Sequence, residues 1–220
     1  MALLASDILD TVSGELHDQN RIRWTLARLF DFLTDAMRQT VLIRPDAYSA
    51  VEVMHLTPGN TRQSIPADAV RFLSLVRNMG SDGLTPGQPI PVTAREALDA
   101  SMVTWHQAAS GDSIDNYAFN PDTPTIFWVT PPPGANVHVE IEVAKKPATV
   151  TSLTNVLPLS EVWAEPLREY TLYRCYSINA ASPVDGARAT RHLAQFYTAL
   201  GEEAKAKALR SPVIPTYKGV

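Results

Sequence analysis

The sequence Val-His-Val-Glu-Ile-Glu-Val at residues 137–143 alternates apolar and polar side chains without a break. Successive side chains of a β-strand point to opposite faces of a sheet, so this alternation predicts a half-exposed strand. Immediately upstream, a Pro-Pro-Pro-Gly corner at 131–134 separates it from Thr-Ile-Phe-Trp-Val at 125–129, a run rich in strand formers. The two runs predict neighbouring strands.

Strand signals continue toward the N-terminus. Apolar β-formers recur between residues 48 and 80, interrupted by Thr-Pro-Gly-Asn at 57–60, a sequence typical of a turn. The glycine-rich segment 80–87 is typical of a loop, and a short helical stretch follows at 93–102. We therefore predict a mostly β lobe over residues 48–157, built from antiparallel strands.

Both flanks of this lobe have helical periodicity. Leu4, Ile8 and Val12 fall at four-residue spacing, with Ser6 as the expected N-cap, and a second stripe runs from Leu26 to Val41. Residues 1–47 are predicted to form a helical hairpin, and its second helix is expected to end before Pro45. Residues 158–209 predict two further helices that pack on this hairpin. The order of elements predicts an α+β fold, a helical bundle with an inserted antiparallel β lobe.

The last residues, 210–220, lack any period and contain two prolines, so they predict an extended tail. Such a tail is either a frayed terminus or a segment that becomes ordered on a neighbouring protein.

Composition excludes several classes of protein. The chain has 220 residues, 19 basic against 23 acidic side chains and a net charge of −4, which disfavours a DNA reader. Its single cysteine forms no internal disulfide and no cysteine-rich zinc site. No stretch approaches the roughly 20 apolar residues of a membrane span, and the N-terminus lacks the basic region of a secretory signal. These features favour an intracellular product with no membrane partner.

Few residues in the sequence are candidates for catalysis or for binding a metal or cofactor. Cys175 could act as a nucleophile with His106, His138 or His192 as its base, but its apolar helical surroundings favour a buried, inert thiol. The histidines lack metal-ligand spacing, and the glycines of 80–87 belong to no phosphate-binding motif. We predict no enzyme, no metal and no cofactor.

Several fragments, in order, resemble the head-to-tail adaptors of short-tailed phages, the tail tubular protein A group. The longest is RWTLARLFDFLTDAMRQTVLIRPDA at 23–47, with an "R-W" helix start and an "R-P-D-A" exit; Thr34 stands where the family pattern has asparagine. The other fragments are QSIPAD (63–68), VRNMG (76–80), REALD (95–99), TIFWV (125–129) and YTLYRCYS (170–177).

The resemblance implies a structural virion protein of the phage neck, assembled in the host cytoplasm. Such adaptors form a ring, of 12 subunits, that joins the portal protein to the tail nozzle protein, continues the DNA channel and in some phages meets tail fibres. Their C-terminal segment engages the portal, which here implies a portal-binding set of Arg210, Pro212, Val213, Ile214, Pro215 and Tyr217. Lys145 and Lys146, together with loop 80–87, are candidates to face the lumen and passing DNA.

Two alternatives stay open. The chain could have another neck role, as a tail-completion or stopper protein. It could instead be a small non-catalytic module that binds a soluble ligand through exposed Trp105, Trp128 or Tyr117.

Overall fold

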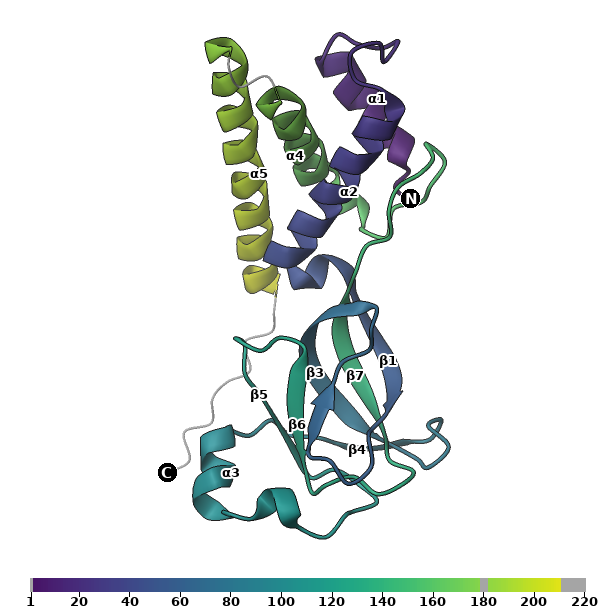
Figure 1. Cartoon of the computed structure of the whole chain (residues 1–220), viewed down its shortest axis with the longest axis vertical. Coiled ribbons are helices and arrows are strands. Elements are labelled where there is room, and N and C mark those ends of the chain that lie inside the picture. The colour runs from purple at the N-terminus through teal and green to yellow at the C-terminus, as the bar shows by residue number, and fades with distance from the viewer. Residues whose placement is uncertain (1, 179–181, 211–220) are drawn as a thin grey trace. The chain divides into compact units, whose positions relative to one another are not determined.

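The computed structural model describes residues 2–178 and 182–210, and it contains two compact units (Figure 1). The helical unit comprises Met1–Arg44 with Pro147–Val220, and the β unit comprises Pro45–Lys146. Helices from both ends of the chain thus share one unit, and antiparallel sheets form the inserted one. The predicted α+β class is confirmed. Residues 147–157, which the sequence grouped with the β lobe, belong to the helical unit by their contacts.

A four-stranded antiparallel sheet forms one layer of the β unit. Its strands lie in the order β1 (Ser49–His55), β7 (His138–Lys145), β3 (Ala69–Met79) and β4 (Pro86–Pro89). The alternating sequence of 137–143 continues into β7, an interior strand, and its valines and isoleucine are fully buried while its glutamates are half-buried. The predicted alternation is therefore present. The end of the predicted loop 80–87 belongs instead to the short edge strand β4, which pairs with β3.

The second sheet has three strands, β2 (Arg62–Ser64), β6 (Ile126–Thr130) and β5 (Asn116–Phe119), in that order. One apolar cluster contains residues of both sheets, and Phe72 of β3 stacks on Phe127 of β6 with ring centroids 4.7 Å apart. Burial of such a cluster is the main source of stability for a sheet pair of this size. The turn at 57–60 separates β1 from β2, which pair in different sheets.

Strand β3 is bulged along its length. Its 11 residues pair with the eight of β7 through register shifts between Ala69 and Arg71, Phe72 and Ser74, and Leu75 and Arg77. Each bulge inserts one residue and reverses which face the following side chains reach. As a result the buried positions of β3 recur every third residue, at Phe72, Leu75 and Asn78.

Short helices complete this unit. They are the 3-10 turn η1 (Pro45–Tyr48), helix α3 (Arg95–Ser101) and the 3-10 turn η2 (Trp105–Gln107). Trp105 is fully buried, and its indole Nε1 donates a hydrogen bond to Asp99 Oδ1 at 2.8 Å. This contact fixes η2 against α3.

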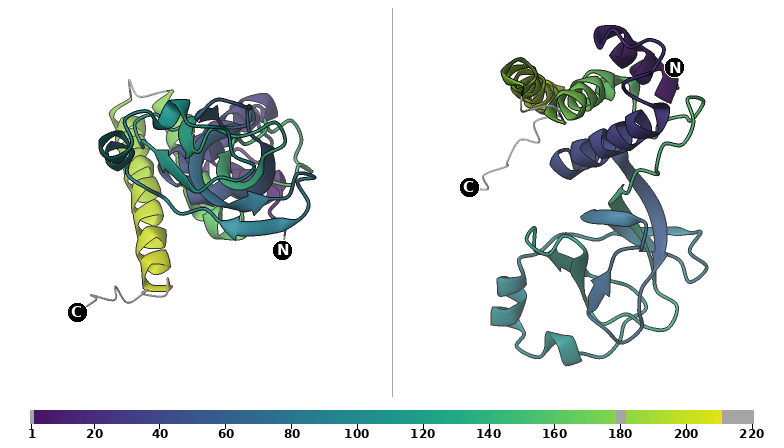
Figure 2. Two further views of the ribbon diagram at one scale, coloured as in Figure 1. Left: turned by 90° about the horizontal axis from the view of Figure 1, so that it is seen from below. Right: turned by 45° about the horizontal axis from the view of Figure 1, so that its top comes forward.

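The helical unit is organised around α4 (Ala164–Ser177). This helix packs against α1 (Ala5–Glu15), α2 (Leu26–Ile43) and α5 (Pro183–Arg210), and it follows the 3-10 turn η3 (Glu161–Trp163). Figure 2 shows α5 running beside α4. In the turn between α1 and α2, the Asp18 carboxylate accepts the N–H groups of Ile22, Arg23 and Trp24. The hydrogen bond from the Trp24 N–H lowers the pKa of Asp18, whereas partial burial acts to raise it. The net result is a pKa below the ordinary value.

A strap, which we define as residues 147–160, crosses the start of α1 and the side of α2. The N–H groups of Ala5 and Ser6 donate to the carbonyl oxygens of Asn155 and Leu153, each at 3.0 Å. These are the orphan donors that a capping side chain would otherwise satisfy. The expectation of Ser6 as a cap is therefore wrong: α1 begins at Ala5, Leu4 precedes it, and the strap's carbonyls take the role of the cap.

We expect the substitution Thr34→Val to detach the strap from α2. Thr34 Oγ1 donates to the carbonyl oxygen of Phe30 at 2.8 Å and accepts the buried N–H of Val150 at 3.0 Å. Valine has the same shape but leaves that N–H unpaired, a loss of about 1–2 kcal/mol in the free energy of unfolding. Urea denaturation measures it. Thr40→Val is the matched control, because Thr40 is buried on the same helix and bonds only the Ala36 carbonyl oxygen. Equal losses in the two variants would contradict the prediction.

Candidate interaction surfaces

The residues predicted to bind the portal fall mostly outside the described part of the chain. Pro212, Val213, Ile214, Pro215 and Tyr217 all lie there. Arg210 is the last residue of α5, so the helix extends through a position that the sequence assigned to the extended tail. Within α5, Phe196 and Leu200 are buried, which anchors the helix to its unit before the tail begins.

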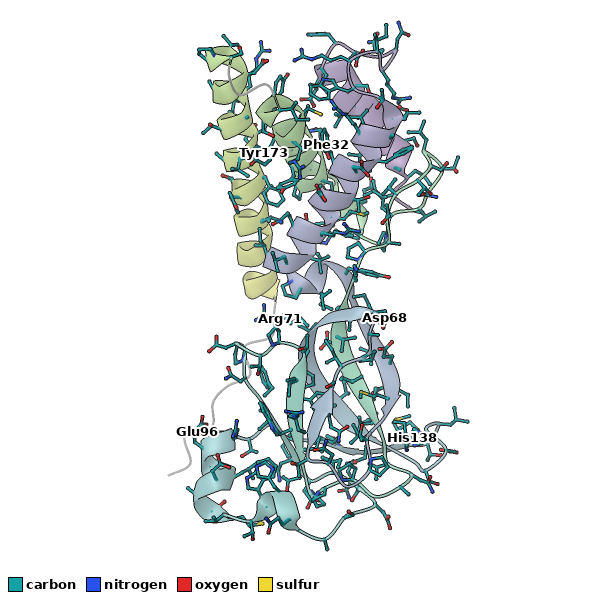
Figure 3. All side chains as sticks on the ribbon, viewed as in Figure 1. Phe32, Asp68, Arg71, Glu96, His138 and Tyr173 are labelled. Atoms are coloured by element: carbon teal, nitrogen blue, oxygen red, sulfur yellow. The ribbon has the colours of Figure 1, made fainter. Side chains whose placement is uncertain are left out.

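Lys145 and Lys146 are adjacent in sequence but differ in environment. The Lys145 ammonium donates to Glu52 Oε2 at 2.6 Å and to Asp68 Oδ2 at 2.8 Å, and only 10% of its side chain is exposed. Burial alone would lower the pKa of Lys145, but the two carboxylates outweigh it and raise that pKa. Lys146 is exposed and has no ion pair among the described residues. Figure 3 shows Asp68 where β3 begins.

Cys175 is completely buried on α4. Burial raises its pKa to about 12, although Arg23 and Arg174 act in the opposite direction. A thiol that stays protonated at neutral pH is a poor nucleophile. Its possible base His192 donates instead from Nδ1 to Glu169 Oε2 at 2.8 Å, while His106 and His138 belong to the β unit.

Two of the three aromatic residues considered for ligand binding are buried. Trp105 and Tyr117 belong to the interior of the β unit, so the expectation that they are exposed is wrong. Trp128 is half-buried, and the guanidinium of Arg95 covers its ring at 4.9 Å from the centroid. These side chains do not form a shared exposed aromatic surface.

The helical unit contains a polar pocket of about 340 Å³ that the sequence reasoning missed. The turn after α1, the end of α4 and the start of α5 supply its walls, which include Arg23, Arg188 and Arg191. Asp185 lies between two of them, 3.8 Å from the Arg23 guanidinium and 4.0 Å from that of Arg188. Guanidinium groups suit an anionic partner, and Asp185 already fills part of that role. In the sequence, this pocket could have been suspected only from the three-residue spacing of Arg188 and Arg191.

His138, labelled in Figure 3, is the first residue of β7. It pairs with His55 of β1. Their ring centroids are 4.7 Å apart, and His55 Nε2 lies 2.9 Å from the carbonyl oxygen of Ala135. His138 is half-buried, and its Nδ1 has no hydrogen-bond partner among the described residues. Gly83, with φ +70°, lies against His138, and a side chain there would meet the His138 ring at 3.2 Å and Val53 at 3.3 Å.

Within residues 2–178 and 182–210, no cluster of three or more histidine, cysteine or acidic side chains could hold a metal ion. No helix in the same part of the chain is long and apolar enough to cross a membrane.

Comparison with known proteins identifies the family. A search of curated proteins found no match. The family model described as SU10 adaptor protein matches residues 4–216, which includes both units and most of the tail. The predicted resemblance to phage head-to-tail adaptors is thereby confirmed. The chain belongs to the SU10 adaptor protein family, and it is a structural component of the phage virion.

Proposed function

We propose that this protein forms an adaptor ring in the neck of a short-tailed phage, where it joins the portal protein to the tail nozzle and continues the DNA channel. The family match over residues 4–216 carries this proposal. A ring subunit needs two different interfaces, one for each neighbour. Exposed apolar side chains on both units suit this need, among them Leu42, at 68% exposed, and Val103, at 83%. The proposed role is structural and requires no catalysis, in agreement with the buried Cys175 thiol.

The number of subunits, 12, comes from the resemblance to adaptors and belongs to the proposal. Electron microscopy of the protein, alone and mixed with the portal of the same phage, tests it through two-dimensional class averages. We expect rings that cap the portal with matching symmetry. If the protein is monomeric alone but assembles on the portal, the adaptor role is still supported, with the portal as the template of assembly. If the protein neither self-associates nor binds the portal, the proposal is contradicted. If it forms rings that do not bind the portal, a tail-completion or stopper role is favoured.

The C-terminal tail, with Pro212, Val213, Ile214, Pro215 and Tyr217, is the segment that we propose to bind the portal. A chain that ends at Arg210 retains α5 with its buried Phe196 and Leu200, so we expect its thermal unfolding to match that of the full chain. Portal binding, measured by co-sedimentation, should be lost. A chain with residues 211–220 in scrambled order is the matched control and should also fail to bind. Unchanged binding by the truncated chain would contradict this role.

Of the two lysines proposed to face the channel, Lys146 is the better candidate. Its ammonium is exposed, whereas that of Lys145 is held by Glu52 and Asp68. Passage of DNA requires weak, non-specific contact, and the exposed ammonium of Lys146 on a subunit with a net charge of −4 fits that requirement.

A further inference from the structure

The two sheets of the β unit have four edges, and three of them are protected against pairing with another strand. β4 is a four-residue strand with a proline at each end, and proline cannot donate a ladder hydrogen bond. β2 has only three residues. β5 already bonds residues 91–93, through Tyr117 N–H to the Pro91 carbonyl oxygen and Thr93 N–H to the Tyr117 carbonyl oxygen. The fourth edge, β1, has seven residues and contains no proline, glycine or lysine.

The register of β1 shows which of its backbone groups face outward. The N–H of Leu56 donates to the carbonyl oxygen of Val137 at 3.0 Å, in line with the register that pairs His55 with His138. Hydrogen-bonded and non-bonded pairs alternate along an antiparallel ladder. The even positions of β1 therefore bond to β7, and the N–H and C=O groups of Ser49, Val51, Val53 and His55 point away from the sheet. None of these groups has a hydrogen-bond partner among the described residues.

The side chains at this edge suit an added strand. Val51 and Val53 project from one face of β1 with 57% and 46% of their surface exposed. Burial of such β-branched side chains against a neighbouring strand is favourable, because cross-strand pairs of this kind stabilise sheets. The edge thus offers both unpaired backbone groups and apolar surface. Figure 1 shows the position of β1 beside β7.

On the other face, Glu52 makes the edge acidic. Glu52 and Asp68 share the single ammonium of Lys145, which leaves one negative charge in excess. Glu52 Oε1 is buried and accepts no hydrogen bond among the described residues, although 31% of the Glu52 side chain is exposed. Full-length antiparallel pairing of β1 with β1 of a second copy would place Glu52 directly opposite its own counterpart, and like charges in that position are destabilising. The charge pattern therefore opposes self-pairing and favours a basic partner.

We propose that β1 accepts an extended segment of a different protein, which adds as a fifth strand to the four-stranded sheet. This segment carries a lysine or arginine opposite Glu52 and apolar, β-branched side chains beside Val51 and Val53. Backbone hydrogen bonds supply affinity and alternate side chains supply specificity in this mode of recognition. The choice of a portal or tail nozzle protein as the source of the segment rests on the proposed function.

Amide hydrogen exchange tests the proposal, with the probe being the portal and the nozzle protein of the same phage. In the isolated protein, we expect rapid exchange at Val51, Val53 and His55 and slow exchange at Ala50, Glu52 and Met54. In the assembled complex, exchange at the first set should slow by about a hundredfold, as for other newly formed ladder bonds. An assembled complex in which these amides still exchange rapidly would overturn the inference, whereas failure of any complex to assemble would count against the proposed function.

A proline variant provides a second test. Val53→Pro removes an outward N–H without breaking a bond to β7, so we expect an unchanged unfolding temperature and at least tenfold weaker association with the partner. Val53→Thr keeps the N–H and the β-branched shape and is the matched control, which should associate as the wild type does. Equal association by the two variants would overturn the inference. The inference would also be overturned if the wild type self-associates and Val53→Pro abolishes that self-association, because the added strand would then come from a second copy of this chain.

Discussion

Replacement of Asn78 by leucine should lower the free energy of unfolding of the β unit by about 3 kcal/mol, because it leaves two buried backbone groups without partners. The side chain of Asn78 is buried on β3. Its amide group bonds the backbone of Ile114 in the way that the backbone of a neighbouring strand would. Its Oδ1 accepts the N–H of Ile114 and its Nδ2 donates to the carbonyl oxygen of the same residue, each at 2.8 Å. Ile114 belongs to the apolar core, so water cannot replace these bonds without opening it.

Urea denaturation monitored by tryptophan fluorescence measures this loss. Asn78→Asp keeps the acceptor for the Ile114 N–H but presents an oxygen to the Ile114 carbonyl oxygen, so it should also destabilise the unit. Asn120→Leu is the control, since Asn120 Oδ1 accepts the exposed N–H of Asp122, which water can satisfy. We expect that variant to lie within about 0.5 kcal/mol of the wild type. A similarly small change in Asn78→Leu would contradict the prediction, because it would show that the hydrogen bonds between Asn78 and Ile114 contribute little to stability.

Local periodicity was sufficient to predict the class of the fold. The alternation around β7 and the apolar stripes of α1 and α2 each arise from one element facing one core, so the pattern survives in the sequence. β3 is the opposite case. Its bulges give buried positions at Phe72, Leu75 and Asn78, a spacing of three that resembles neither an ideal strand nor an ideal helix. Its polar core residue, Asn78, could not be recognised without knowledge of Ile114.

Contacts between distant segments account for the remaining differences. The start of α1 is satisfied by carbonyl groups of Leu153 and Asn155, almost 150 residues away, so a search for a local capping side chain points to the wrong residue. In the same way, Lys145 looks like a free cation in the sequence, but the fold brings Glu52 and Asp68 to it. The open edge of β1 depends on strand order and register, which no single stretch of sequence contains.

The second large effect concerns the buried carboxylate of Glu169 on α4. Only 6% of its side chain is exposed, and it accepts hydrogen bonds from Nδ1 of His192 at 2.8 Å and from the guanidinium of Arg168 at 3.1 Å. The variant His192→Leu removes one donor and leaves the carboxylate partly unpaired in the interior. We expect it to lower the free energy of unfolding of the helical unit by about 2–4 kcal/mol at neutral pH.

The double variant Glu169→Leu with His192→Leu distinguishes an unpaired charge from a loss of packing. Because it removes the buried charge along with its partner, it should recover most of the stability that His192→Leu loses. If the double variant is as unstable as the single one, the effect of His192 lies in its stacking on Tyr176, whose ring lies nearly parallel to it with centroids 5.4 Å apart. Thermal unfolding followed by circular dichroism at 222 nm, a helix signal, measures all three proteins.

The same pair predicts how stability depends on pH. Burial would raise the pKa of Glu169, but the hydrogen bonds from His192 and Arg168 outweigh it and hold that pKa below its ordinary value of 4.5. A carboxyl group whose pKa is lower in the folded state than in the unfolded state stabilises the protein at pH values above 4.5, and this contribution is lost as the pH falls through the lower, folded value. The stability difference between the wild type and His192→Leu should therefore be largest at neutral pH and shrink below pH 4.5. A difference that stays constant down to pH 3 would mean that His192 stabilises the helical unit by packing and not through the ionised carboxylate.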